Sequence, residues 1–179
     1  MPILFVIAFS NQCSGQHDSS YIGLVKNYIH FVDSYYHHTN TFELNKKDTS
    51  SYIATKKEEG YYIDSLYNKI GWWDITTTSD TKKDSIFKIT CVKISYEYKM
   101  FIYKYFYYRS NKLVYAEIEL RDKSNKMEIK YSAKELYSSG NLIFRENKID
   151  SLPQEYMWVK ELNMYTDGNN YIDRYFSEK

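Results

Sequence analysis

Residues 85–149 hold the longest strand pattern in the sequence, and this pattern limits the possible folds more than any other feature. Within residues 92–98, Val92 and Ile94 alternate with Lys93, which places apolar and polar side chains on opposite faces of a strand. Polar, turn-like clusters punctuate the stretch at residues 109–112, 122–126 and 138–141. This succession of strands and turns predicts an antiparallel meander.

Two amphipathic segments flank the strands. In residues 18–38 an apolar stripe recurs at helical spacing, formed by Tyr21, Val25, Tyr28, Val32 and Tyr35. Near the C-terminus, Pro153 suits the first turn of a helix, and Asp167 with Gly168 predicts a break in that helical segment. We therefore expect an α+β fold, an antiparallel β-meander of about six to eight strands with an N-terminal and a C-terminal helix packed on it.

The N-terminal residues predict export. Residues 3–9 are a continuous apolar run, too short to span a bilayer, and small or polar residues follow it up to Gly15. We interpret residues 1–15 as a truncated signal-peptide-like segment and residues 16–179 as a single α+β domain; a buried N-terminal strand is the alternative. The expected location is secreted or periplasmic. A lipid anchor on Cys13 is a minority alternative, because Ser10, Asn11 and Gln12 do not match a lipobox.

Charge and cysteine content exclude several classes of function. The formal net charge is +1, so no strong field is available to attract nucleic acid or anionic lipid. The 2 cysteines form neither a disulfide framework nor a metal-binding spacing. The 21 tyrosines are the anomaly: many should lie at the core edge with their hydroxyl groups in water, although a biased genome also explains their number.

The same sequence pattern occurs three times, at residues 61–70, 106–115 and 135–144. It consists of an aromatic strand, a short polar turn and an apolar strand. The spacing is unequal, which indicates recurring hairpins rather than a solenoid. With the clipped export signal ending near Gln16, residues 59–149 resemble the small exported proteins of unknown function common in Bacteroidetes. The resemblance implies an envelope location and carries no catalytic residues.

No motif for catalysis, metal binding or a cofactor is found. His17, His30, His37 and His38 lack an HExxH pattern, and no G-x-S-x-G elbow or Gly-rich phosphate loop occurs. Cys91 lies inside a strand, where a buried and inert thiol is expected. Carboxylates could still pair on one sheet face, although interspersed lysines predict cross-strand ion pairs there instead. These carboxylates are Glu97, Glu117, Glu119 and Glu128.

The aromatic residues are the best candidates for binding. Tyr103, Tyr105 and Tyr107 share one face of a strand, which we expect to be core if a helix covers it and a recognition surface if none does. Trp72 and Trp73 are adjacent, so they should point to opposite faces, with one ring exposed or at an edge. We take these five residues as the candidate binding set.

Together these features predict an exported non-catalytic protein, a binding or structural module of the cell envelope. The first alternative is an inhibitor or immunity-type protein that blocks one enzyme. The second is a hydrolase that uses a carboxylate pair. The expected partner is a protein or a small ligand, with possible envelope association, no nucleic acid, no cofactor and no transmembrane helix.

Overall fold

The computed structural model describes residues 12–41, 53–97, 99–149 and 152–178. Its contacts divide the chain into two compact units, Met1–Glu43 and Leu44–Lys179, and each is described by itself. Residues 1–11 of the predicted export signal lie outside the described residues. Residues 12–15, which include Cys13, are described by their backbone alone.

The first unit contains helix α1 (Gln12–Thr41), which confirms the predicted N-terminal helix and begins earlier than residue 18. Of the predicted apolar stripe, Val25 and Val32 are buried and Tyr21 and Tyr28 are half-buried. The side chain of Tyr35 lies outside the described residues. Among the helices described, none is long and apolar enough to cross a membrane.

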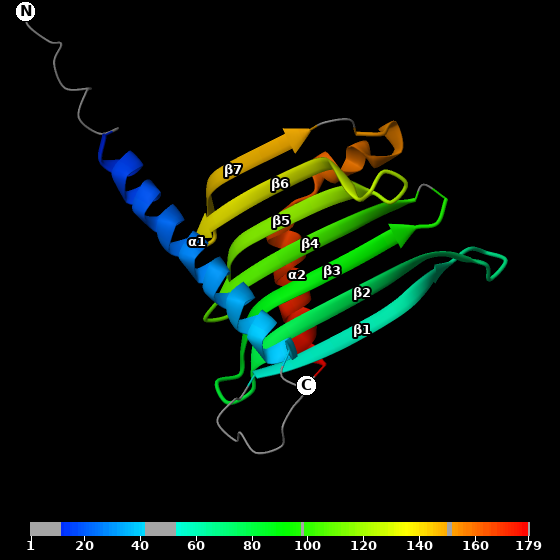
Figure 1. Cartoon of the computed structure of the whole chain (residues 1–179). Coiled ribbons are helices and arrows are strands. Elements are labelled where there is room, and N and C mark those ends of the chain that lie inside the picture. The colour runs from blue at the N-terminus through cyan, green and yellow to red at the C-terminus, as the bar shows by residue number, and fades with distance from the viewer. Residues whose placement is uncertain (1–11, 42–52, 98, 150–151, 179) are drawn as a thin grey trace, which may run out of the picture. The chain divides into compact units, whose positions relative to one another are not determined.

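The second unit is built on a seven-stranded antiparallel sheet whose strands lie side by side in chain order (Figure 1). The strands are β1 (Ile53–Ile63), β2 (Lys69–Asp80), β3 (Ser85–Ser95), β4 (Met100–Arg109), β5 (Lys112–Asp122), β6 (Glu128–Ser138) and β7 (Asn141–Ile149). This order confirms the predicted meander. β3 and β4 are separate strands that pair antiparallel across a turn.

Two of the predicted hairpins close with two-residue turns. Ser110 and Asn111 have φ angles of 51° and 60°, and Ser139 and Gly140 have φ angles of 51° and 84°. Left-handed conformations at both central residues define the type I′ turn, whose twist matches that of the flanking strands. The short turns fix the registers of β4 with β5 and of β6 with β7.

Two helical segments after β7 build the core against one face of the sheet, here called the α2 face. They are the 3₁₀-helix η1 (Gln154–Glu161) and helix α2 (Met164–Ser177). Figure 1 shows α2 crossing the middle strands. The cluster beneath these helices joins Tyr156, Val159, Met164 and Ile172 to buried sheet residues, among them Phe106, Leu113, Ile118 and Leu120.

The break predicted at Asp167 and Gly168 is wrong, because both residues lie inside α2. The helical path is interrupted earlier, between η1 and α2, where Asn163 adopts an extended conformation and its side chain accepts a hydrogen bond from the N–H of Thr166. Gly168 is buried against the sheet: a Cβ there would lie 2.8 Å from Cδ1 of Phe106. Close packing therefore explains this glycine.

Candidate functional site

Exposed apolar side chains gather at one end of the sheet in the described part of Leu44–Lys179. This end, called the hairpin end, holds the turns after β1, β3 and β5 and helix η1 (Figure 1). Leu142, in the turn region at the other end, is the exception among the large exposed apolar residues of this unit. The hairpin-end residues are Tyr61, Tyr62, Ile63, Leu66, Tyr67, Ile70, Tyr96, Ile149, Met157 and Trp158.

The turn between β1 and β2 holds two of these side chains in water on a fixed backbone. Leu66 is 77% exposed and Tyr67 is 84% exposed. The Oδ1 atom of Asp64 accepts hydrogen bonds from the backbone N–H groups of Leu66, at 2.8 Å, and Asn68, at 2.9 Å. Tyr67 has a left-handed φ of 62°, unusual for a bulky residue. The turn is therefore ordered locally around two solvent-exposed apolar side chains.

A trough runs over the α2 face beside this turn. Its larger part is a cavity of about 360 Å³, and its smaller part is a cavity of about 200 Å³. Tyr62 and Lys93 line both parts, so the two cavities are adjacent. The larger cavity falls in the size range of small-molecule sites. Its other lining residues are Ile70, Ile94, Ser95, Met100, Ile102, Glu155, Tyr156 and Trp158.

Glycines on neighbouring strands make room for the rings of the trough. Gly60 pairs with Trp73, and a Cβ at Gly60 would lie 2.7 Å from the Trp73 ring. Gly71 pairs with Tyr62, and a Cβ there would lie 3.1 Å from the Tyr62 ring. Each ring thus lies over the backbone of the adjacent strand, which gives the trough an aromatic lining at this edge of the sheet.

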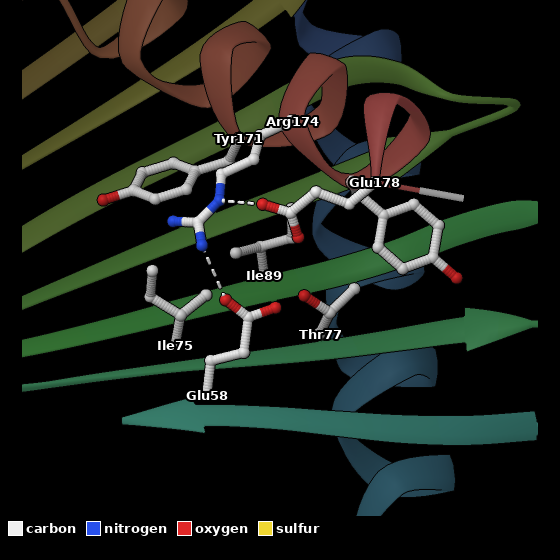
Figure 2. A pocket seen from close by; sticks show the side chains of 8 residues that line it. Glu58, Ile75, Thr77, Ile89, Tyr171, Arg174 and Glu178 are labelled. Atoms are coloured by element: carbon white, nitrogen blue, oxygen red, sulfur yellow. Dashed lines mark hydrogen bonds and ion pairs between the residues drawn. The ribbon is translucent and has the colours of Figure 1, made fainter. Parts of the chain in front are cut away.

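Two of the four charged residues that line the trough, Arg174 and Asp74, form ion pairs. Arg174 donates from Nη2 to Glu58, at 2.9 Å, and from Nε to Glu178, at 2.7 Å (Figure 2). The cavity beside these three residues measures about 20 Å³, roughly the space of one water molecule, which is too small for a ligand. Asp74 forms an ion pair with Lys57 at 3.0 Å.

Lys93 and Glu155 differ from these pairs. Both line the larger cavity, and neither forms an ion pair with any residue that the structure describes. Lys93 is half-buried, is flanked in register by Trp73 and Ile102, and its Nζ lies 5.9 Å from the centroid of the Tyr62 ring. Glu155 is exposed on η1. The cavity therefore carries one half-buried cation and one carboxylate at its solvent-exposed side.

The predicted binding residues are divided between the two faces. Trp73 lines the smaller cavity of the trough, whereas Trp72 lies on the opposite face, as their adjacency predicts. Both indoles are half-buried, so neither ring is fully exposed, and the Trp73 ring lies against Gly60 of the edge strand β1. Tyr103, Tyr105 and Tyr107 share the face of Trp72, outside the cluster beneath α2.

Tyr103 and Tyr105 stack along β4 with ring centroids 6.3 Å apart, and both rings are half-buried. Tyr107 is buried and meets Tyr115 edge-on at 5.5 Å. Burial raises the pKa of Tyr105 to about 12, with smaller contributions from nearby charges. These tyrosines form an ordered aromatic row, separated by the sheet from the trough.

Glu117 and Glu119, two of the carboxylates predicted to pair, lie on the face of the aromatic row and interact with other residues. Glu119 forms an ion pair with Arg121, and Glu117 lies 3.4 Å from the Lys134 ammonium and accepts a hydrogen bond from the Tyr115 hydroxyl at 2.7 Å. Glu117 and Lys134 are cross-strand partners in register. Glu97 is exposed in the turn after β3 and Glu128 pairs with Lys130, so the four carboxylates are not gathered. The expected cross-strand ion pair is confirmed.

Cys91 is buried beneath α2 close to Lys104, Asp167 and Tyr171. Burial raises the pKa of the Cys91 thiol to about 12, which keeps it protonated at neutral pH and suits the predicted inert thiol. His30 is exposed on α1, and the other three histidines have side chains outside the described residues. Within the described residues, no three metal-ligating side chains are grouped to hold an ion.

Comparison of the chain with protein-family models, with curated proteins and with solved structures finds no match. The resemblance to exported Bacteroidetes proteins therefore stays a prediction.

The most exposed apolar residues were missed at the sequence level. The hairpin over residues 61–70 was predicted, but Leu66 and Tyr67 within its turn were not singled out. A signal was available: a turn flanked by Asp64 and Asn68 is normally polar throughout, and two apolar residues inside it are unusual. Lys93 and Trp158 gave no such signal, because the fold brings them to one cavity from distant parts of the chain.

Proposed function

We propose that this protein is a non-catalytic binding module that docks on a partner protein through its hairpin end. The observation that carries the proposal is the gathering of exposed apolar side chains at that end, around the ordered turn of Leu66 and Tyr67. Exposed apolar residues that are scattered need no explanation, but six of these residues fall in the single hairpin between Tyr61 and Ile70, and a grouped apolar surface marks an interaction site. Tyrosine is also enriched among residues that dominate binding energy.

The conformation of the turn supports protein docking. Because Asp64 already orders the backbone of Leu66 and Asn68, little conformational entropy is lost when the turn enters a pocket. Burial of a side chain of this size contributes about 1.5–3 kcal/mol. A partner with an apolar cleft therefore suits Leu66 and Tyr67.

A second candidate, the inhibitor or immunity-type protein, is favoured by the same turn. A projecting, pre-ordered loop fits the pattern of inhibitor complexes, in which the backbone moves little on binding. The two candidates differ in the identity of the partner. If the partner is an enzyme whose activity falls when this protein is added, the inhibitor function is supported.

The test is site-specific photo-crosslinking in an envelope extract of the source organism. A photoreactive residue in place of Tyr67 should capture one defined protein, and Leu66→Asp in the same chain should abolish the capture. The matched control places the photoreactive residue at Leu142, the exposed apolar position at the other end of the sheet. Equal capture at both positions, or capture unaffected by Leu66→Asp, would contradict docking through the hairpin end.

Export to the envelope is part of the proposal and is supported by the apolar run and small residues within residues 1–15. Intact mass measurement of the protein from its natural source tests it. A mature chain that begins near Gln16 supports export, and an added lipid mass on Cys13 would support the anchored form. A retained, unmodified N-terminus would contradict both.

A further inference from the structure

We propose that the larger cavity of the trough binds a small organic anion, a molecule with one carboxylate or similar anionic group on an aromatic or aliphatic body. The anionic group would contact Lys93, and the apolar body would lie between Tyr62, Ile102 and Trp158. The cavity shares Tyr62, Ile70 and Trp158 with the hairpin end but does not include Leu66 or Tyr67, the residues changed in the crosslinking test, so ligand binding can be tested apart from protein docking.

The side chains that line the cavity determine the size and the apolar character of the ligand body. Rings and aliphatic side chains from β1, β2, β3, β4 and η1 converge there, and Tyr62 and Trp158 remain 38% and 46% exposed. Aromatic walls offer large contact area at low conformational cost. At about 360 Å³, the cavity has room for a body of one or two rings.

The ammonium group of Lys93 determines which charge the ligand carries. Arg174, the other cation that lines the trough, already has carboxylate partners in Glu58 and Glu178, whereas Lys93 has none among the described residues. A half-buried ammonium group next to rings is less well solvated than a surface lysine, and an anionic ligand group would restore a charge-assisted hydrogen bond. The complementary ligand group is therefore an anion.

Glu155 limits the ligand to one anionic group. It is the carboxylate among the residues that line the larger cavity, and it lies exposed on η1. A second anionic group on the ligand would meet this carboxylate, and like charges at short distance repel. A molecule with a single negative end and an uncharged body fits both charges.

The test compares 2-naphthoate, which carries a carboxylate, with 2-naphthamide, its neutral analogue, by isothermal titration calorimetry on the full chain. We expect the acid to bind about tenfold more tightly than the amide, the factor expected for one charge-assisted hydrogen bond. Lys93→Gln should bring the affinity for the acid down to that for the amide. Lys83→Gln, in the exposed turn after β2, is the matched control and should preserve the tenfold ratio.

A second variant separates the apolar contact from the charge. Trp158→Ala should weaken both compounds and leave their ratio unchanged, with circular dichroism confirming that the variant is folded. Equal affinity of the native protein for acid and amide overturns the proposal. So does a preference for the acid that survives Lys93→Gln, or a lack of binding of either compound at millimolar concentration. None of these outcomes bears on the crosslinking test at Tyr67, so the two proposals fail separately.

Discussion

Gly168 shows how one missing methyl group positions a helix. In most helices Gly→Ala stabilises the fold by up to about 1 kcal/mol. Here the added Cβ would lie 2.8 Å from Cδ1 of Phe106 and 2.9 Å from Cδ2 of Leu113, both buried residues. We expect Gly168→Ala to lower the free energy of unfolding by about 1–2 kcal/mol, because overpacking outweighs helix propensity. Urea denaturation measures the difference.

Gly23 provides the matched control at the residue level. It also lies in a helix, and a Cβ there would meet nothing within 4 Å. Gly23→Ala should therefore leave stability unchanged or raise it by a few tenths of a kcal/mol to about 1 kcal/mol. If both substitutions had the same effect, close packing at Gly168 would not be the reason for that glycine.

Gly168 is also a residue whose conformation the sequence pattern predicted wrongly. The pair Asp167 and Gly168 resembles a turn, and propensity alone predicts a break. Tertiary packing against Phe106 overrides this preference, and the hydroxyl of Tyr108 donates to the Gly168 carbonyl at 2.6 Å. The alternation of apolar and polar residues predicted the strands more reliably than turn propensity predicted the helix break. In a strand every second side chain lies on the same face, and this does not depend on tertiary contacts.

At the scale of elements, α2 is joined to the sheet by a charge pair in the core. Lys104 of β4 is 5% exposed and donates to Asp167 of α2. Asp167→Asn would leave the Lys104 ammonium buried without its counter-charge. We expect a loss of about 2–3 kcal/mol in the free energy of unfolding, somewhat below that of a fully buried pair because Asp167 is partly exposed. Chemical denaturation with urea gives the value.

The double variant Lys104→Met with Asp167→Asn should recover most of that loss, because a buried charge is no longer left alone. The surface pair of Lys56 and Glu58, at 2.8 Å, serves as control: Lys56→Gln should leave the free energy of unfolding nearly unchanged, because the pair is screened by water. A double variant as unstable as Asp167→Asn would mean that the unpaired Lys104 ammonium group is not the cause of the loss.

The elements themselves were largely predictable, and the candidate site was not. Alternation and turn residues between 85 and 149 depend on local geometry, so the strands and type I′ hairpins follow from neighbours in sequence. The trough depends on contacts between residues as distant as Tyr62, Lys93 and Trp158. These residues lie around one cavity only because of the order of the strands and because η1 packs near β3 and β4. No local sequence pattern specifies either feature.

At the scale of the whole sheet, charged residues protect the two edge strands against pairing with another sheet, whereas the hairpin end carries exposed apolar residues. Edge strand β1 carries Lys56, Lys57, Glu58 and Glu59 in succession, and edge strand β7 carries Arg145, Glu146 and Lys148. Charged side chains on edge strands oppose pairing with another sheet. The apolar turn of Leu66 and Tyr67 lacks this protection, which is why docking is assigned to the hairpin end.

The many buried and half-buried tyrosines should set the highest pH at which the folded state is stable. Burial raises the pKa of Tyr105 to about 12 and also raises the pKa of Tyr115, Tyr137 and Tyr171. The unfolded chain releases these protons near pH 10, so the folded state binds more protons above that pH. The corresponding stability is therefore complete below about pH 10 and is lost as the pH rises toward 12 and beyond.

We expect the tyrosines with raised pKa values to ionise above pH 10, together with loss of the far-ultraviolet circular dichroism. Tyrosinate absorbance followed in parallel with circular dichroism measures both. Tyr105→Phe should raise the midpoint of alkaline unfolding by on the order of a few tenths of a pH unit, because one group that favours the unfolded state is removed. Tyr67→Phe, at an 84% exposed position, should leave the midpoint unchanged. Ionisation of all tyrosines in one step near pH 10, with the sheet intact, would contradict the burial that raises these pKa values.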